Sequence, residues 1–465
     1  MLPSQRNERA MTIAPPAPLP QVYHRHRLTP QDKTSARVQS SAEGFSPAQF
    51  AWMRIPPPMP ARLDWGKVTI LLLMLPLFGQ SFHYIKDLPP LWALSKAFPL
   101  VALPLAPVLL YRPYSPFSRQ LGFTFLWLVL ISSFAAVPAF GQSFFMGLTG
   151  QIKLLPILSF FSFLGLLYWQ KPTLRELTAA FVICGVATLV VLLAVWLLAP
   201  QSWYVGTIEV GDAPLLSADA RGNRIRMPMF FAVLAMFYWY RIANQKRQMK
   251  YMVLVALVLA CLMGLVRTRA LVLGSVATLA AAMLVATTPR RRMIVLILVP
   301  ILLIAMFQIP YVASVFDTDQ NSGLQVRVIT AQKATAFLGE DWINWLFGVG
   351  SISSIDPKGM AHFFSHYFFL ADITWLGIIF EFGLVGAALL LAMPARGMYF
   401  LRKLRNRIDH PLLAAMQDYL LYVILISGLY PSLTLQPGEV AVILATAVYC
   451  RWAVKDFRAR KRPFA

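Results

Sequence analysis

Residues 251–287, YMVLVALVLACLMGLVRTRALVLGSVATLAAAMLVAT, show most directly which kind of fold this sequence forms. The only charged residues of this stretch are Arg267 and Arg269, close to its middle. A helix needs about 20 apolar residues to cross a bilayer, because each residue rises roughly 1.5 Å and the hydrocarbon core is about 30 Å thick. The stretch therefore predicts two membrane-spanning helices, 251–266 and 270–287, joined by a tight hairpin from Leu265 to Leu271.

Apolar blocks of this kind recur along the chain. Hydrophobic residues make up 58% of its 465 residues and charged residues only 13%, whereas a soluble domain carries about 25% charged residues. Only helices satisfy their own backbone within lipid, and barrel strands would alternate polar and apolar residues, which these blocks do not. We therefore predict an all-α fold class, a polytopic transmembrane helical protein of about twelve spans. The other spans are expected at approximately 67–84, 91–111, 121–140, 153–169, 176–199, 228–242, 293–309, 366–394, 413–431 and 438–454.

The net charge of +22 comes mainly from short basic clusters between the apolar blocks, which indicates membrane topology and lipid contact rather than nucleic-acid binding. Cytoplasmic loops are enriched in Lys and Arg, and this rule places both termini in the cytoplasm. We expect a disordered cytoplasmic tail over 1–65, a transmembrane domain over 66–455 and a basic cytoplasmic tail over 456–465. All three cysteines lie in apolar blocks, so no disulfide framework is predicted.

Two loops on the outer side are long, 200–227 and 310–362. Long loops within compact proteins are usually functional or disordered. The second loop, which precedes the tenth span, contains Trp342, Trp345 and Phe347, and this is not the composition of a disordered segment. We expect it to pack as a small helical cap on the outer face.

Cationic side chains collect on this outer side, against the general charge trend. Arginine near hydrocarbon costs a few kcal/mol, so arginines in such places tend to be functional. A planar guanidinium suits bidentate binding of phosphate oxygens. The alternative is that these side chains reach the phosphates of outer-leaflet lipids. The candidate phosphate-binding residues are Arg224, Arg226, Arg267, Arg269, Arg327 and Lys153.

A candidate base lies at the start of the tenth span. A neutral histidine accepts a proton near neutral pH, which points to His366, and Asp372 would orient a base, act as one or cap a broken helix. His362 shares a helical face with His366, but a metal site needs further ligands, so no metal is predicted. A continuous helix over 363–394 would exceed the hydrocarbon thickness, and its first turns should then project to the outer surface or lie along it. Glu381, which lies deeper, is expected to pair with an arginine.

Outward-facing arginines, a candidate base and an apolar groove between helices suit a lipid-linked diphosphate whose sugars project outside. The arginines would hold the diphosphate, which is also the leaving group, and would stabilise the charge that develops on its oxygen. The base would deprotonate a sugar hydroxyl of the acceptor. The outer loops contain no nucleotide fingerprint and no Asp-rich metal motif, so no cofactor is predicted.

Four segments carry a family resemblance: RGNRIRMPMFFAVLA at 221–235, GLVRTRALVLGSV at 264–276, QVRVITAQKATAFLGEDWINWLFGVG at 325–350 and DITWLGIIFEFGLVG at 372–386. In this order and topology, they resemble the O-antigen ligase and polymerase superfamily, which includes the exopolysaccharide polymerases of Gram-negative bacteria. The resemblance implies that Arg224 or Arg226, Arg267 or Arg269, and Arg327 bind undecaprenyl diphosphate, and that His366 acts in the loop.

The sequence departs from the ligase pattern at one position. Ligases have His followed by Asn, whereas Tyr367 follows His366 here. Asp372-Ile373 before a glycine-rich helix looks more like the exopolysaccharide polymerases. The identity of the base, His366 or Asp372, therefore stays open.

The leading hypothesis is a metal-independent glycosyltransferase, a polysaccharide polymerase of the bacterial inner membrane. It would transfer glycan from undecaprenyl diphosphate to a lipid-linked repeat unit at the periplasmic face, in exopolysaccharide or O-antigen synthesis. The implied partners are a flippase and a chain-length co-polymerase. The nearest alternative is an O-antigen ligase that uses lipid A core as the acceptor. An alternative of another class is a transporter of lipid-linked oligosaccharide, although no internal repeat is visible.

Overall fold

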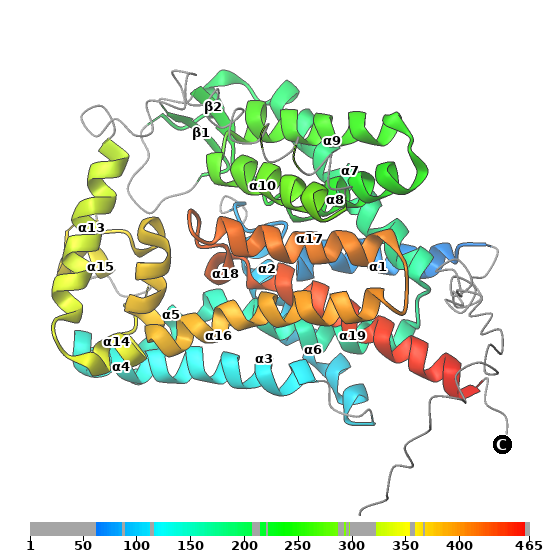
Figure 1. Ribbon diagram of the computed structural model, residues 1–465. Coiled ribbons are helices and arrows are strands. Elements are labelled where there is room, and N and C mark those ends of the chain that lie inside the picture. The colour runs from blue at the N-terminus through cyan, green and yellow to red at the C-terminus, as the bar shows by residue number, and fades with distance from the viewer. Residues whose placement is uncertain are drawn as a thin grey trace, which may run out of the picture. The chain divides into compact units, whose positions relative to one another are not determined.

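The computed structural model divides into two units, Met1–Ile55 and Pro56–Ala465. It describes residues 62–85, 89–111, 116–206, 214–219, 222–286, 322–353, 359–365 and 368–460, with single positions at 293 and 297 (Figure 1). All of these belong to the second unit. Three expected segments lie largely outside the described residues. They are the tail over 1–65, of which only the last four residues are described, the span over 293–309, of which only positions 293 and 297 are described, and the last five residues of the chain.

The described chain is a helical membrane protein. Five helical stretches are long and apolar enough to cross a membrane, namely Phe117–Phe140, Ile152–Gln170, Leu174–Leu198, Met249–Val266 and Leu370–Arg405. Three apolar helices are shorter, Trp65–Phe78, Arg269–Val285 and Pro411–Ile426. The predicted all-α membrane fold class is confirmed by this part of the chain.

The helices of the first half are α1 (Trp65–Phe78), α2 (Pro89–Val101), α3 (Pro116–Leu126), α4 (Ser132–Phe140), α5 (Phe144–Gly150), α6 (Ser159–Gln170) and α7 (Leu174–Leu198). Those of the second half are α8 (Phe230–Lys246), α9 (Met249–Cys261), α10 (Arg269–Ala286), α13 (Ser322–Leu338), α14 (Trp342–Phe347), α15 (Gly359–Phe363), α16 (Thr374–Arg405), α17 (Pro411–Ile426), α18 (Ser432–Leu435) and α19 (Pro437–Arg460). Short 3₁₀ or π segments extend several of them: η3 (Leu103–Tyr111), η4 (Trp127–Ile131), η5 (Ile152–Leu158), η6 (Gln201–Trp203), η7 (Leu262–Val266) and η8 (Leu370–Ile373). Helix α19 continues five residues beyond the boundary expected at 455.

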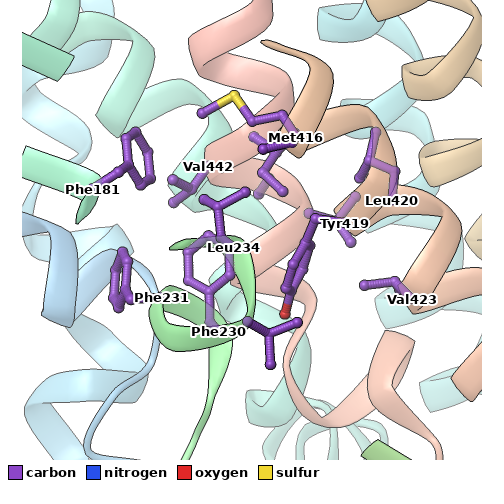
Figure 2. Packing of buried hydrophobic residues seen from close by; sticks show 14 of the residues in the cluster. Phe181, Phe230, Phe231, Leu234, Met416, Tyr419, Leu420, Val423 and Val442 are labelled. Atoms are coloured by element: carbon purple, nitrogen blue, oxygen red, sulfur yellow. The ribbon is translucent and has the colours of Figure 1, made fainter. Parts of the chain in front are cut away.

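Helix α8 lies in the centre of the bundle and is buried almost all round. Its Phe230 and Phe231 pack against Phe181 of α7, and Phe230 meets the ring of Tyr419 of α17 at a centroid distance of 5.0 Å (Figure 2). A helix that is hydrophobic on all faces is stable only where other helices surround it. The aromatic layer thus fixes α7, α8 and α17 against one another.

An ion pair fastens the other end of the same helices. Arg241 of α8 donates from Nε to Oδ2 of Asp418 at 2.6 Å and from Nη2 to Oδ1 at 2.5 Å, and Asp418 of α17 is only 5% exposed. The fork of the guanidinium matches both carboxylate oxygens. This contact lies far from the start of α8, where the candidate arginines precede it in the sequence.

A small β-hairpin stands in the first long loop, where the sequence had indicated no strand. Strands β1 (Leu216–Asp219) and β2 (Gly222–Ile225) pair antiparallel, with Leu216 opposite Ile225 and Ser217 opposite Arg224. Val205 joins from the other side of β1 through a parallel bridge. Four-residue strands with polar side chains give no clear alternating pattern, so only the folded chain reveals them.

The hairpin gathers with other loop elements at one end of the bundle. Strands β1 and β2, the turn before α10, helices α13 to α15 and helix α18 all lie at the left in Figure 1. We call this end of the second unit the hairpin end. The described parts of loop 310–362 include the helices α13, α14 and α15. Phe337 of α13 packs on Phe364 and Phe380, which anchors α13 to α16.

The described residues of the span expected at 366–394 do not form one continuous helix. Helix α15 ends at Phe363, the 3₁₀ turn η8 covers Leu370–Ile373, and α16 is interrupted at Gly383, where φ is 68° and ψ is 178°. The segment after α14 fills this break, because the Val349 N–H donates to the carbonyl of Phe380 at 2.8 Å. A backbone group that the break would leave unpaired is thereby satisfied by a distant part of the chain.

Candidate functional site

The register of the two strands fixes the position of Arg224, the first of the candidate arginines. Arg224 of β2 lies opposite Ser217, and its Nε donates to Ser217 Oγ at 3.0 Å. Its side chain is buried, with 8% of the residue exposed. Arg226 follows the end of β2, and its backbone N–H donates to the Leu215 carbonyl at 2.7 Å. The hairpin therefore fixes the backbone positions of both arginines. The sequence had predicted only an irregular loop over 200–227.

The tight turn at 265–271 brings Arg267 to the same hairpin. Arg267 has a left-handed φ of 53°, directly after the π-helical turn Leu262–Val266, and its Nε donates to the Gly264 carbonyl at 2.9 Å. Its guanidinium lies against Gly222, where an added Cβ would be only 2.3 Å from Nη1. Two segments that the sequence treats as separate loops thus meet side by side. Arg269 begins helix α10 two residues later.

Asp372 and Arg327 complete this arrangement. Asp372 lies in η8, directly before α16, and Arg327 lies on α13. The positive charges of Arg327 and Arg226 both act on the Asp372 carboxyl group. The structure therefore brings together three of the predicted site residues, which come from three different parts of the chain. Burial of the Asp372 carboxyl group disfavours its charged form more than the two arginine charges favour it, so the group is placed to carry or exchange a proton.

His366 lies outside the described residues, as does the side chain of His362. The residues around His366 are well packed, since the rings of Phe364 and Phe368 stack at 4.0 Å and Lys333 Nζ donates to the Phe364 carbonyl at 3.0 Å. The role of His366 as a base stays a prediction.

Lys153 has a carboxylate partner. Its Nζ lies 2.7 Å and 2.6 Å from the two oxygens of Glu381, and the ring of Phe382 is 5.6 Å away. Glu381 was expected to pair with an arginine, so the prediction of a pair is confirmed and the predicted partner is wrong. Glu381 thus already compensates the charge that Lys153 would offer to a diphosphate.

We expect the Lys153–Glu381 pair to be strongly coupled. Breaking a buried ion pair by removal of one partner costs about 3–5 kcal/mol, because it leaves the other charge uncompensated, and the loss is smaller here because the Lys153 side chain is 27% exposed to solvent. Lys153→Met and Glu381→Gln should each lower the melting temperature of the purified protein in detergent, and the double variant should recover most of the loss. Additive losses in the double variant would show that the two groups do not interact.

The site also contains residues that sequence reasoning missed. The Tyr84 hydroxyl is 2.6 Å from the Tyr430 hydroxyl, and Tyr84 interacts electrostatically with Arg224, Arg226 and Glu439. Burial raises the pKa of Tyr84, so its phenol remains a proton-carrying donor at neutral pH. No spacing or motif marks a tyrosine in a short loop. One sequence feature could have indicated this polar region: Glu439, an acidic residue at the start of the last apolar block.

Glu439 is a buried carboxylic group, 4% exposed, and the Tyr419 hydroxyl donates to its Oε2 at 2.5 Å. Gln80 holds the neighbouring backbone, since its Oε1 accepts from the Gly438 N–H at 3.1 Å. These contacts join the loop after α1 to the start of α19. The arginines of the hairpin end thus face a polar layer built from several helix ends.

By its fold and this site, the protein is a helical membrane protein with a cluster of cationic side chains at one end of its helix bundle. No family model and no curated protein sequence matches the chain.

Proposed function

We propose that this protein is a polysaccharide polymerase, which transfers a growing glycan from undecaprenyl diphosphate to a lipid-linked repeat unit. The observation that carries the proposal is the convergence of the arginines. Arg267 lies against the hairpin that holds Arg224, and Arg226 acts on Asp372 together with Arg327. A diphosphate carries several negative oxygens, and a set of guanidinium groups at one place matches it in charge and geometry.

The reaction needs no cofactor in this proposal. A hydroxyl oxygen of the acceptor sugar bonds to the anomeric carbon of the donor glycan, and the bond from that carbon to the diphosphate oxygen breaks. The hydroxyl proton passes to Asp372 or His366, and undecaprenyl diphosphate leaves with the bonding electron pair. Arginines at the leaving oxygen stabilise the charge that develops there, which is the largest electrostatic demand of the transition state.

The proposed membrane topology has about twelve spans, with both termini in the cytoplasm and the hairpin end in the periplasm. Its support is the charge distribution, because the basic clusters of the sequence alternate with the apolar blocks in the positive-inside pattern. In this topology the large loop 310–362 precedes the tenth span on the periplasmic side, and the protein is a multi-pass protein of the bacterial inner membrane. A flippase would supply repeat units, and a chain-length co-polymerase would set the length of the product.

The test is a reconstituted reaction. The purified full-length protein is incubated in nanodiscs with undecaprenyl-diphosphate-linked repeat units, and the glycan products are sized by gel electrophoresis. We expect a ladder of polymers that remain linked to the lipid. Transfer of glycan only to added lipid A core would instead indicate a ligase, and transport of the substrate across liposome membranes without any new glycosidic bond would indicate a transporter.

A further inference from the structure

A second group of cationic side chains lies near Arg224 and Arg226, which we call the arginine cluster together with Arg267 and Arg327. Lys96 of α2 is only 5% exposed, and its Nζ lies 2.6 Å from Nδ1 of His83, in the loop after α1. Lys153, on η5, adds a second positive charge that acts on Lys96. Sequence reasoning did not single out His83.

Lys96 differs from Lys153 in its partner. Glu381 holds both of its oxygens on Lys153, at 2.6 Å and 2.7 Å. Within the part of the chain that the structure describes, Lys96 has His83 as its polar partner and no carboxylate within 4.0 Å. A buried cation is costly unless an anion accompanies it. Lys96 and His83 therefore offer a place where an anionic group would be stabilised.

The position of this group relates it to the arginines. The ring of His83 packs edge-on against the ring of Tyr84 at 4.7 Å. Tyr84 in turn interacts electrostatically with Arg224 and Arg226. One tyrosine thus separates the Lys96–His83 pair from the arginine cluster.

We infer that Lys96 and His83 form a second phosphate-binding site, which takes the diphosphate of the acceptor lipid while the arginines hold that of the donor. The inference rests on the proposed function, because a reaction between two lipid-linked glycans brings two diphosphates to one site. Two such anions repel each other strongly in a poorly solvated place, so each needs its own cations. A bound phosphate would favour the ammonium form of Lys96, which then serves as a point charge, and the contact of Lys96 with Nδ1 orients the imidazole ring.

The test counts bound diphosphates. The probe is undecaprenyl diphosphate, titrated onto the full-length protein in nanodiscs and counted by native mass spectrometry, with undecaprenol as the reference for binding through the tail alone. We expect two diphosphates per wild-type chain. Lys96→Met and His83→Gln should each retain one, and Lys96→Arg should retain two because it keeps the charge.

A matched control is Lys67→Met, since Lys67 is a partly exposed lysine on α1 paired only loosely with Asp64 at 3.9 Å. It should retain two. Arg226→Ala should retain one, and Arg226→Ala combined with His83→Gln should retain none. The elution profile and melting temperature of each variant show that it is folded, and His83→Gln decides the question if Lys96→Met does not fold.

One diphosphate on the wild-type chain, or two on the folded His83→Gln variant, would overturn the inference. These outcomes are independent of the polymerase assay, because binding is counted without turnover. A protein that makes polymer but binds a single diphosphate contradicts the second site alone. A protein that binds two diphosphates but makes no polymer contradicts the proposed function and supports the second site.

Discussion

Arg226→Ala is expected to lower the rate of polymer formation by about 10²–10³-fold, the loss that follows removal of one donor to a developing negative charge. The reason is its position. Arg226 follows the end of β2, and its charge acts both on Asp372 and on Tyr84. It therefore lies between the candidate base and the polar layer that borders the helices. In the proposed function, loss of its guanidinium removes a phosphate contact and also one of the two positive charges that act on the Asp372 carboxyl group.

The measurement is the initial rate of repeat-unit addition in nanodiscs, at saturating and at limiting substrate. Two controls separate the role of the guanidinium from a general loss of basic charge. Arg226→Lys keeps the charge but loses the bidentate geometry, so it should fall between wild type and alanine. Arg175→Ala removes an exposed arginine from the first turn of α7, at the opposite end of the bundle, and should react at the wild-type rate. Equal rates for Arg226→Ala and wild type would remove Arg226 from the mechanism.

Gly383→Ala is expected to destabilise the fold by about 2–6 kcal/mol, the sum of backbone strain and overpacking. Gly383 has φ of 68° and ψ of 178°, a conformation that is essentially restricted to glycine. A Cβ at this position would lie 2.1 Å from the carbonyl oxygen of Leu346 and 2.4 Å from its carbon. Both are backbone atoms, so no side-chain rotation relieves the contact.

The stability of the Gly383→Ala variant is measured as its melting temperature and its monodisperse yield in detergent. Gly122→Ala is the matched control, because Gly122 also lies in a membrane helix and an added Cβ there meets only Phe161, at 3.9 Å. It should be neutral or slightly stabilising, since alanine favours helix more than glycine does. A Gly383→Ala variant as stable as Gly122→Ala would mean that α16 is continuous in the membrane and that the chain after α14 does not dock into it.

Much of the bundle was predictable from apolar length alone. The segments 121–140, 153–169, 176–199 and 251–266 correspond to helical stretches that can cross a membrane. The tight turn at Arg267 was predictable as well, because two apolar blocks leave only three residues between them. The partners across the site were not predictable. Tyr84 and Tyr430 are 346 positions apart, and Lys153 and Glu381 are 228 positions apart. No local period relates such residues.

Apolar length and charge were sufficient to predict helices that enter a membrane and arginines at helix ends, because bilayer thickness and charge distribution act on each segment independently. Tertiary structure decided where α16 breaks, because only the docking of Val349 onto Phe380 supplies the backbone partner that a break inside lipid demands. It also decided that Arg267 meets the hairpin of Arg224, since that contact depends on two loops folding back to the same end of the bundle.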